Sequence, residues 1–182
     1  MKGIIITDIW GKTPAAEKLA QSFSNVRIID PYSGTYFRFK QEQEAYHYFQ
    51  TNIGLNKYVE HLHKELQNQK EPYVLIGFSM GASAAWKLSE QLHKLGCNKF
   101  VGLYGSQIRK ATEIEPSIPT HLVFPKQEAH FDIDELMDAL KQKPQLEMTK
   151  TSYLHGFMNQ HSENYDPYGY LSYLNFLLEY SQ

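Results

Sequence analysis

The chain has 182 residues, of which 42% are apolar and 21% are charged, a composition typical of a globular protein and unlike that of a disordered or fibrous one. A formal net charge of −2 leaves no surplus of cations to hold a phosphate backbone, so we expect no nucleic-acid partner. The length suits a single domain over residues 1–182, which we expect to be a monomer or a homodimer. Because no apolar run approaches about 18 residues and the lone Cys97 has no disulfide partner, we expect a cytoplasmic location without membrane contact.

Short apolar runs alternate with helical patterns along the chain, which is typical of a parallel sheet covered by helices on both faces. Strands are predicted at residues 3–7, 26–30, 73–77, 99–104, 120–124 and 146–151. The predicted fold class is therefore α/β, with three layers in the order helix, sheet, helix.

Capping signals mark where the helices begin. Thr13 followed by Pro14 starts the first, Asp132 with Glu135 starts a short one that ends near Lys141, and Asp166-Pro167 starts the last. Apolar spacing predicts the helix faces Leu55-Tyr58-Val59-Leu62-Leu66, Ala82-Ala85-Trp86-Leu92 before a cap at Gly96, and Leu171-Leu174-Leu177-Leu178.

Residues 32–49 are dense in aromatic side chains, between a predicted strand and a helix that contains Tyr46 and Tyr48. These rings either line or cover a pocket, or pack over one edge of the sheet. The sequence favours neither alternative.

Residues 77–81, Gly-Phe-Ser-Met-Gly, follow a predicted strand and precede a helix. In such a G-x-S-x-G turn the serine is held in a strained conformation, and the flanking glycines let neighbouring backbones pass closely. We therefore predict that Ser79 is a nucleophile.

A nucleophilic serine needs a base, and a carboxylate to orient that base. His155 directly follows the last predicted strand, and Gly156 gives its loop freedom to aim the ring across the sheet edge, so it is the predicted base. His161, in the same loop, is the alternative. His93 is predicted to lie mid-helix and His121 inside a strand.

Glu128 is the predicted orienting carboxylate, because it stands just past the strand at residues 120–124. Asp132 and Asp134 are close by and remain alternatives, although a helix N-cap and a first-turn position already explain them.

Two backbone N–H groups are expected to stabilise the negative charge that develops on the substrate oxygen. One is that of Met80, directly after the nucleophile, and the other is that of Ile9, in the loop after the first strand. Asp8, Trp10, Phe78 and Phe157 are expected to contact the substrate.

Four segments of the chain resemble motifs of the dienelactone hydrolases, a family with the α/β-hydrolase fold. They are Asp8-Ile9-Trp10-Gly11, Asp30-Pro31-Tyr32, residues 77–81 and His155-Gly156-Phe157. The resemblance implies an ester or lactone hydrolase without a cofactor, with Asp8 near the nucleophile. Three departures, which are Ser79 for a cysteine, Glu128 for an aspartate and Ala82 for a glycine, limit the expected substrate to a small carboxylic ester, thioester or lactone.

Other functions find less support in the sequence. Gly11-Lys12-Thr13 resembles the end of a phosphate-binding loop, but Ile6 stands where that motif needs a glycine. His61 and His63 point to different helix faces, so no metal site is predicted. A hydrolase-like scaffold that binds a small molecule or a protein without catalysis remains the alternative function.

Overall fold

The computed structural model describes residues 2–181, so the first and last residues of the predicted domain lie outside it. Six parallel strands form one sheet in the order β2-β1-β3-β4-β5-β6. The strands are β1 (Lys2–Ile6), β2 (Val26–Ile29), β3 (Tyr73–Phe78), β4 (Cys97–Leu103), β5 (Thr120–Phe124) and β6 (Leu146–Lys150). The helices are α1 (Pro14–Gln21), α2 (Glu42–Asn52), α3 (Gly54–Gln67), α4 (Met80–Lys87), α5 (Ile133–Leu140) and α6 (Pro167–Tyr180), with a 3₁₀-helix η1 (Ser106–Lys110).

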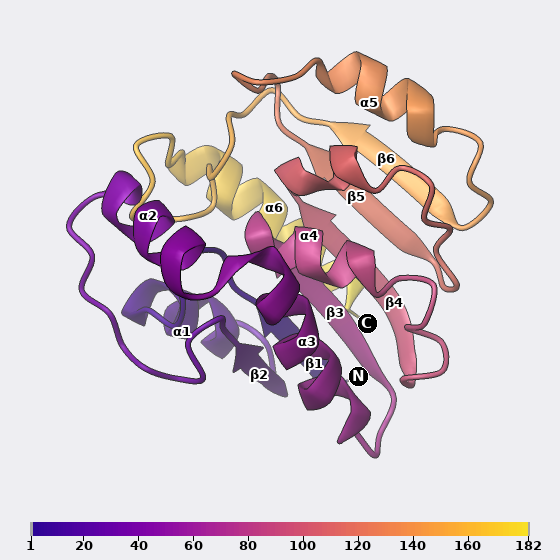
Figure 1. The fold of residues 1–182 in the computed structure, drawn as a ribbon, viewed down its shortest axis with the longest axis horizontal. Helices are drawn as coiled ribbons and strands as arrows, with labels where there is room; N and C mark the ends of the chain where they lie inside the picture. The colour runs from indigo at the N-terminus through magenta and orange to yellow at the C-terminus, as the bar shows by residue number, and fades with distance from the viewer. Residues whose placement is uncertain (1, 182) are drawn as a thin grey trace.

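The predicted three-layer arrangement is confirmed (Figure 1). Alternate residues of β1 and β3 enter two separate cores, as the period of two in a strand requires. Ile4 and Leu75 pack with α2, α3, α4 and α5 on one face, whereas Ile5 and Ile76 pack with α1 and α6 on the other. All six predicted strands are found, with ends that differ by no more than two residues.

The predicted N-caps are confirmed. Thr13 Oγ1 accepts from the Ala16 N–H at 3.1 Å, and Asp166 Oδ1 accepts from the Tyr168 N–H at 2.9 Å. Asp132 Oδ1 likewise accepts from Asp134 N at 2.7 Å. Each side chain satisfies a helix N–H that has no partner within the helix.

The helix predicted to run from Ala82 to a cap at Gly96 ends earlier, at Lys87. The N–H groups of Leu88 and Ser89 donate to carbonyls three residues back, and Ser89 Oγ donates to Trp86 O at 2.7 Å, so the chain continues as tight turns. His93 consequently lies in a turn and not mid-helix.

The prediction of which residues of α6 are buried is also partly wrong. Leu177 is fully buried, but Leu171 is 57% exposed. Aromatic rings of the same helix, including Tyr173 and Phe176, take up the space over the sheet, so the buried face is rotated away from Leu171.

The aromatic side chains of residues 32–49 pack mainly against one another, beside the sheet. The rings of Tyr32, Phe37, Phe39 and Tyr48 lie 4.6–6.0 Å apart, next to the core on the α2 side. Within residues 2–181, no helix is long and apolar enough to cross a lipid bilayer.

Candidate active site

Ser79 occupies a strained turn between β3 and α4, with φ 49° and ψ −110°. A non-glycine residue adopts such angles only where the surrounding structure enforces them. Close backbone approach does so here, because a Cβ on Gly77 would lie 2.7 Å from Ala82 Cα and one on Gly81 would lie 2.5 Å from the carbonyl oxygen of Ile6. Gly77 therefore lets the start of α4 lie close against β3, and Gly81 lets it lie close against the end of β1. The Ser79 side chain between them stands at the carboxyl edge of the sheet, facing His155.

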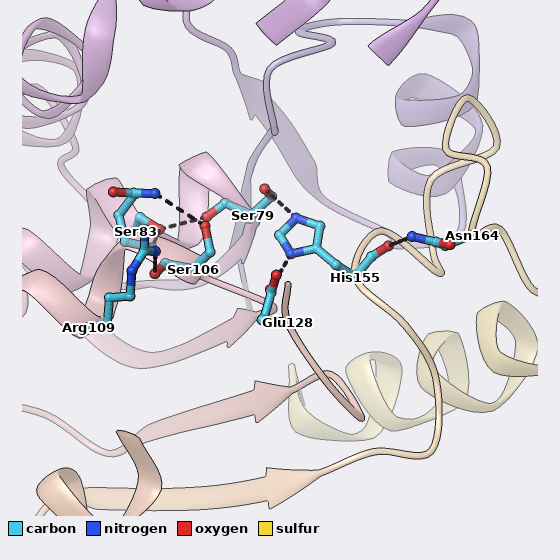
Figure 2. Close-up of polar contacts among 8 residues, drawn as sticks. Ser79, Ser83, Ser106, Arg109, Glu128, His155 and Asn164 are labelled. Atoms are coloured by element: carbon cyan, nitrogen blue, oxygen red, sulfur yellow. Dashed lines mark hydrogen bonds and ion pairs between the residues drawn. The ribbon is translucent and has the colours of Figure 1, made fainter. Parts of the chain in front are cut away.

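A chain of hydrogen bonds links Ser79, His155 and Glu128 (Figure 2). Ser79 Oγ lies 2.9 Å from His155 Nε2, and His155 Nδ1 lies 2.6 Å from Glu128 Oε1. The residues follow β3, β6 and β5 respectively, and the carboxyl ends of parallel strands meet at one edge. When His155 carries its proton on Nδ1, that N–H donates a hydrogen bond to Glu128. Nε2 then has no proton and can accept the hydroxyl proton of Ser79.

The alternatives to His155 and Glu128 have other contacts. Asp132 caps α5, and Asp134 pairs with Lys150 Nζ at 2.6 Å. His161 stacks on Trp10 with ring centroids 5.0 Å apart. None of these three has a hydrogen bond to Ser79 or His155 among the bonds of residues 2–181.

Met80 and Ile9 border the same cleft as Ser79. Met80 is the first residue of α4, so its N–H has no acceptor within the helix. The loop of Ile9 is fixed from two sides, because Tyr32 donates its hydroxyl proton to Ile9 O at 2.6 Å and the Trp10 N–H donates to Asp8 Oδ1 at 3.0 Å. Both predicted donors thus belong to backbone that is held in place beside the Ser79 hydroxyl.

No protein-family model matches the chain. An uncharacterized protein of Bacillus subtilis strain 168, YczH, is 34% identical over 129 residues, which is 69% of this chain and 62% of that relative. The chain therefore spans less than two thirds of the length of the curated relative it matches.

Solved structures resemble the chain over nearly its whole length. The dienelactone hydrolase of Anabaena variabilis covers 98% of this chain and 84% of its own, at 14% identity and a TM-score of 0.68. Alpha/beta hydrolase domain-containing protein 10 from mouse covers 98% and 88%, at 9% identity and a TM-score of 0.67. A dienelactone hydrolase-like promiscuous phosphotriesterase, P91, from metagenomic libraries covers 99% and 85%, at 11% identity and a TM-score of 0.67.

The chain has the α/β-hydrolase fold. Its likeness to dienelactone hydrolases, predicted from four motifs, is confirmed at the level of structure. In this fold the loops after the strands carry the functional side chains, which is where Ser79, Glu128 and His155 lie.

Asp8 lies beside Ser79 and is almost buried, with 9% of its surface exposed. Burial raises the pKa of its carboxyl group to about 6, while hydrogen bonds from Asn159 and from the Trp10 N–H act in the opposite direction. The charge of Glu42 adds to the rise and that of His155 opposes it. Asp8 and Trp10 both line a small cavity of about 20 Å³ that Ser79 and His155 also border.

Neither Phe78 nor Phe157 lines this small cavity, and their contact with the substrate stays a prediction. Phe157 is fully buried, with its ring 5.0 Å from those of Tyr153 and Tyr173. Phe78 lines a neighbouring cavity of about 40 Å³ beneath α1, which Asp8 and Asn159 also border. Phe78 directly precedes Ser79 at the end of β3, so its ring points to the opposite side from the Ser79 hydroxyl, and both Phe78 and Phe157 pack in the core on the α1 and α6 side of the sheet.

The cleft above Ser79 measures about 300 Å³ and contains polar residues that sequence reasoning missed. Glu42 and Tyr46 of α2 border one part of it, which joins the aromatic segment to the site, and Arg109 of η1 borders another. Arg109 lies over the Phe131 ring and donates to Ser106 O (Figure 2). η1 follows β4 at the same sheet edge, and that position was the only sequence signal available for Arg109.

Proposed function

We propose that the chain is a serine hydrolase that cleaves a small carboxylic ester, thioester or lactone through an acyl-enzyme intermediate. The observation that carries this proposal is the chain of hydrogen bonds from Ser79 Oγ through His155 to Glu128, at 2.9 and 2.6 Å. The names of the structural neighbours, which include hydrolases, are consistent with it.

In the first half-reaction, Ser79 Oγ attacks the acyl carbon and its proton passes to His155 Nε2. Glu128 stabilises the resulting imidazolium through Nδ1. The tetrahedral oxyanion accepts hydrogen bonds from the N–H groups of Met80 and Ile9, each of which is worth about 3 kcal/mol in such sites. When the carbon–oxygen or carbon–sulfur bond to the leaving group breaks, His155 returns the proton to that group.

In the second half-reaction, water replaces the leaving group. His155 Nε2 takes a proton from the water, whose oxygen attacks the acyl carbon of the ester on Ser79. Collapse of the second tetrahedral intermediate releases the carboxylic acid and returns the proton to Ser79 Oγ.

The volume of the cleft supports a small substrate. At about 300 Å³ it is at the lower end of ligand sites. The cleft carries both acidic and basic groups, Glu42 and Arg109, which favours a substrate with polar groups around the acyl carbon over a long aliphatic chain.

A fluorophosphonate probe tests the proposal. The wild-type chain is expected to react at Ser79, as located by peptide mass spectrometry, and Ser79→Ala is expected not to react. Rates on p-nitrophenyl esters of increasing acyl length should fall beyond short chains. A folded wild-type chain that neither reacts with the probe nor hydrolyses any ester would favour the alternative of a binding scaffold without catalysis.

A further inference from the structure

Two loops meet beside Ser79, and one pair of side chains joins them. Asn159 Nδ2 donates to Asp8 Oδ2 at 2.5 Å, across 151 residues of sequence. Asp8 belongs to the loop of Ile9, and Asn159 belongs to the loop of His155. Both side chains line the small cavity that Ser79 and His155 border.

Each partner is also fixed within its own loop. Asp8 Oδ1 accepts from the Trp10 N–H at 3.0 Å. Asn159 Oδ1 accepts from the His161 N–H at 2.8 Å, and the Asn159 N–H donates to Gly156 O at 2.8 Å. The carboxylate and the amide therefore use both ends of their side chains, and each end has one partner.

A second contact runs parallel to the first. The Trp10 ring stacks on the His161 ring at 5.0 Å, with 23° between the planes. The backbone N–H groups of these same two residues donate to the linking side chains, that of Trp10 to Asp8 and that of His161 to Asn159. The hydrogen bond and the ring stack thus join the same two loops side by side.

We propose that Asn159 is a positioning residue, which holds the loop of the base His155 against the loop of the oxyanion donor Ile9 so that both keep their places around Ser79. The inference rests on the proposed function. Its physical basis is that catalysis needs the base and the oxyanion donor to be correctly placed at the same time, and that a misplacement of about 1 Å can cost about 100-fold in rate.

Exchanging the two side chains separates this role from other roles of the same residues. Asn159→Asp replaces the amide donor with a second carboxyl group, and two carboxyl groups this close can keep a hydrogen bond by sharing a proton. The variants are therefore compared at alkaline pH, where both groups are ionised and the hydrogen bond between the loops is lost. Asp8→Asn sets two amides against each other, so either Trp10 N–H or the Asn159 amide loses its acceptor. In the double variant the amide at position 8 accepts from the Trp10 N–H and donates to the carboxylate at position 159, which still accepts from the His161 N–H. All three hydrogen bonds are restored, and only the one between positions 8 and 159 has its donor and acceptor exchanged.

The test measures the second-order rate of fluorophosphonate labelling at Ser79, and kcat and KM on p-nitrophenyl acetate, in variants shown to be folded by circular dichroism. Asn159→Asp is expected to label roughly 10- to 100-fold more slowly than wild type, with the loss in kcat and not in KM. The double variant is expected to recover to within about 3-fold of wild type. Should Asn159→Asp fail to fold, Asn159→Ala removes the same donor without adding a charge and is expected to show the same loss.

Two results would overturn the inference. One is labelling of folded Asn159→Asp or Asn159→Ala at the wild-type rate. The other is a double variant no faster than the slower single variant, which would mean that the charge of Asp8, and not the link between the loops, matters. In both cases a labelled wild type leaves the proposed function standing, whereas a wild type that does not label removes both.

Discussion

Glu128 and His155 lie 2.6 Å apart at Oε1 and Nδ1, although they follow different strands, β5 and β6. The Glu128 side chain is only 12% exposed and that of His155 is 24% exposed, so the pair is largely shielded from water. A short, shielded hydrogen bond of this kind orients an imidazole and stabilises its positive charge.

Replacing the carboxylate tests this relationship. Glu128→Gln is expected to keep the fold and to lower kcat roughly 10²- to 10⁴-fold, because an amide neither stabilises the imidazolium nor selects the tautomer that Ser79 needs. The measurement is steady-state hydrolysis of p-nitrophenyl acetate. Asp132→Asn is the matched control, since asparagine caps a helix as well as aspartate does, and it should leave both rate and stability unchanged. A loss in the control equal to that in Glu128→Gln would point to Asp132 as the acid.

The two histidines of the loop after β6 are expected to behave differently. His155→Ala removes the base and should lower kcat roughly 10²- to 10⁴-fold. His161→Ala removes a ring stacked on Trp10 and should lower it less than about 10-fold. Kinetics of the two purified variants decide the matter, and equal losses would contradict the assignment of His155.

The buried carboxyl of Asp8 gives the stability a predictable pH dependence. Because burial raises its folded-state pKa from 3.8 to about 6, the folded chain binds a proton that the unfolded chain has already lost. The contribution of Asp8 to the free energy of unfolding therefore falls as the pH rises from about 4 to 6, by an amount on the order of 3 kcal/mol.

Urea unfolding at several pH values between 4 and 7 measures that contribution. Asp8→Asn cannot titrate, so its free energy of unfolding should decrease less with rising pH than that of the wild type. Parallel pH curves for the two chains would show that Asp8 does not titrate in this range. The neighbouring charges of Glu42 and His155 are present in both chains, so they do not produce the difference.

Gly81→Ala should destabilise the chain, since the added Cβ would lie 2.5 Å from the carbonyl oxygen of Ile6 and backbone would have to move. A cost of about 3 kcal/mol in the free energy of unfolding is expected, together with slower labelling of Ser79. Gly34→Ala is the control. Gly34 has a φ of 82°, and a Cβ added there would have no atom within 4 Å, so only the backbone strain of about 1 kcal/mol is expected.

Features fixed by local chemistry could be read from the sequence. The strands, the N-caps at Thr13, Asp132 and Asp166, and the place of the turn at Ser79 are indicated by residues a few positions apart, although close packing against Ile6 also holds that turn. The meeting of Glu128 with His155 was predictable for a different reason. Both stand just after strands of a parallel sheet, so the topology alone brings them to one edge.

Features that depend on packing between distant segments could not be read in this way. Phe157 is next but one to His155, yet its ring turns into a cluster with Tyr104, Tyr153 and Tyr173. Leu171 fits an apolar face in sequence, but the rings of α6 cover the sheet instead. The contact of Asn159 with Asp8 could not be predicted either, because the two residues are 151 positions apart in the sequence.

Ser79, His155 and Glu128 follow strands that differ in how easily they unfold locally. Ser79 follows β3, whose six residues are all buried at the middle of the sheet, whereas His155 follows β6, an edge strand with no buried residue. Local opening of an edge segment costs less than opening of the centre. On gentle warming the chain should therefore stop turning over ester while its amide protons at the sheet centre still resist exchange with deuterium, and activity should return on cooling.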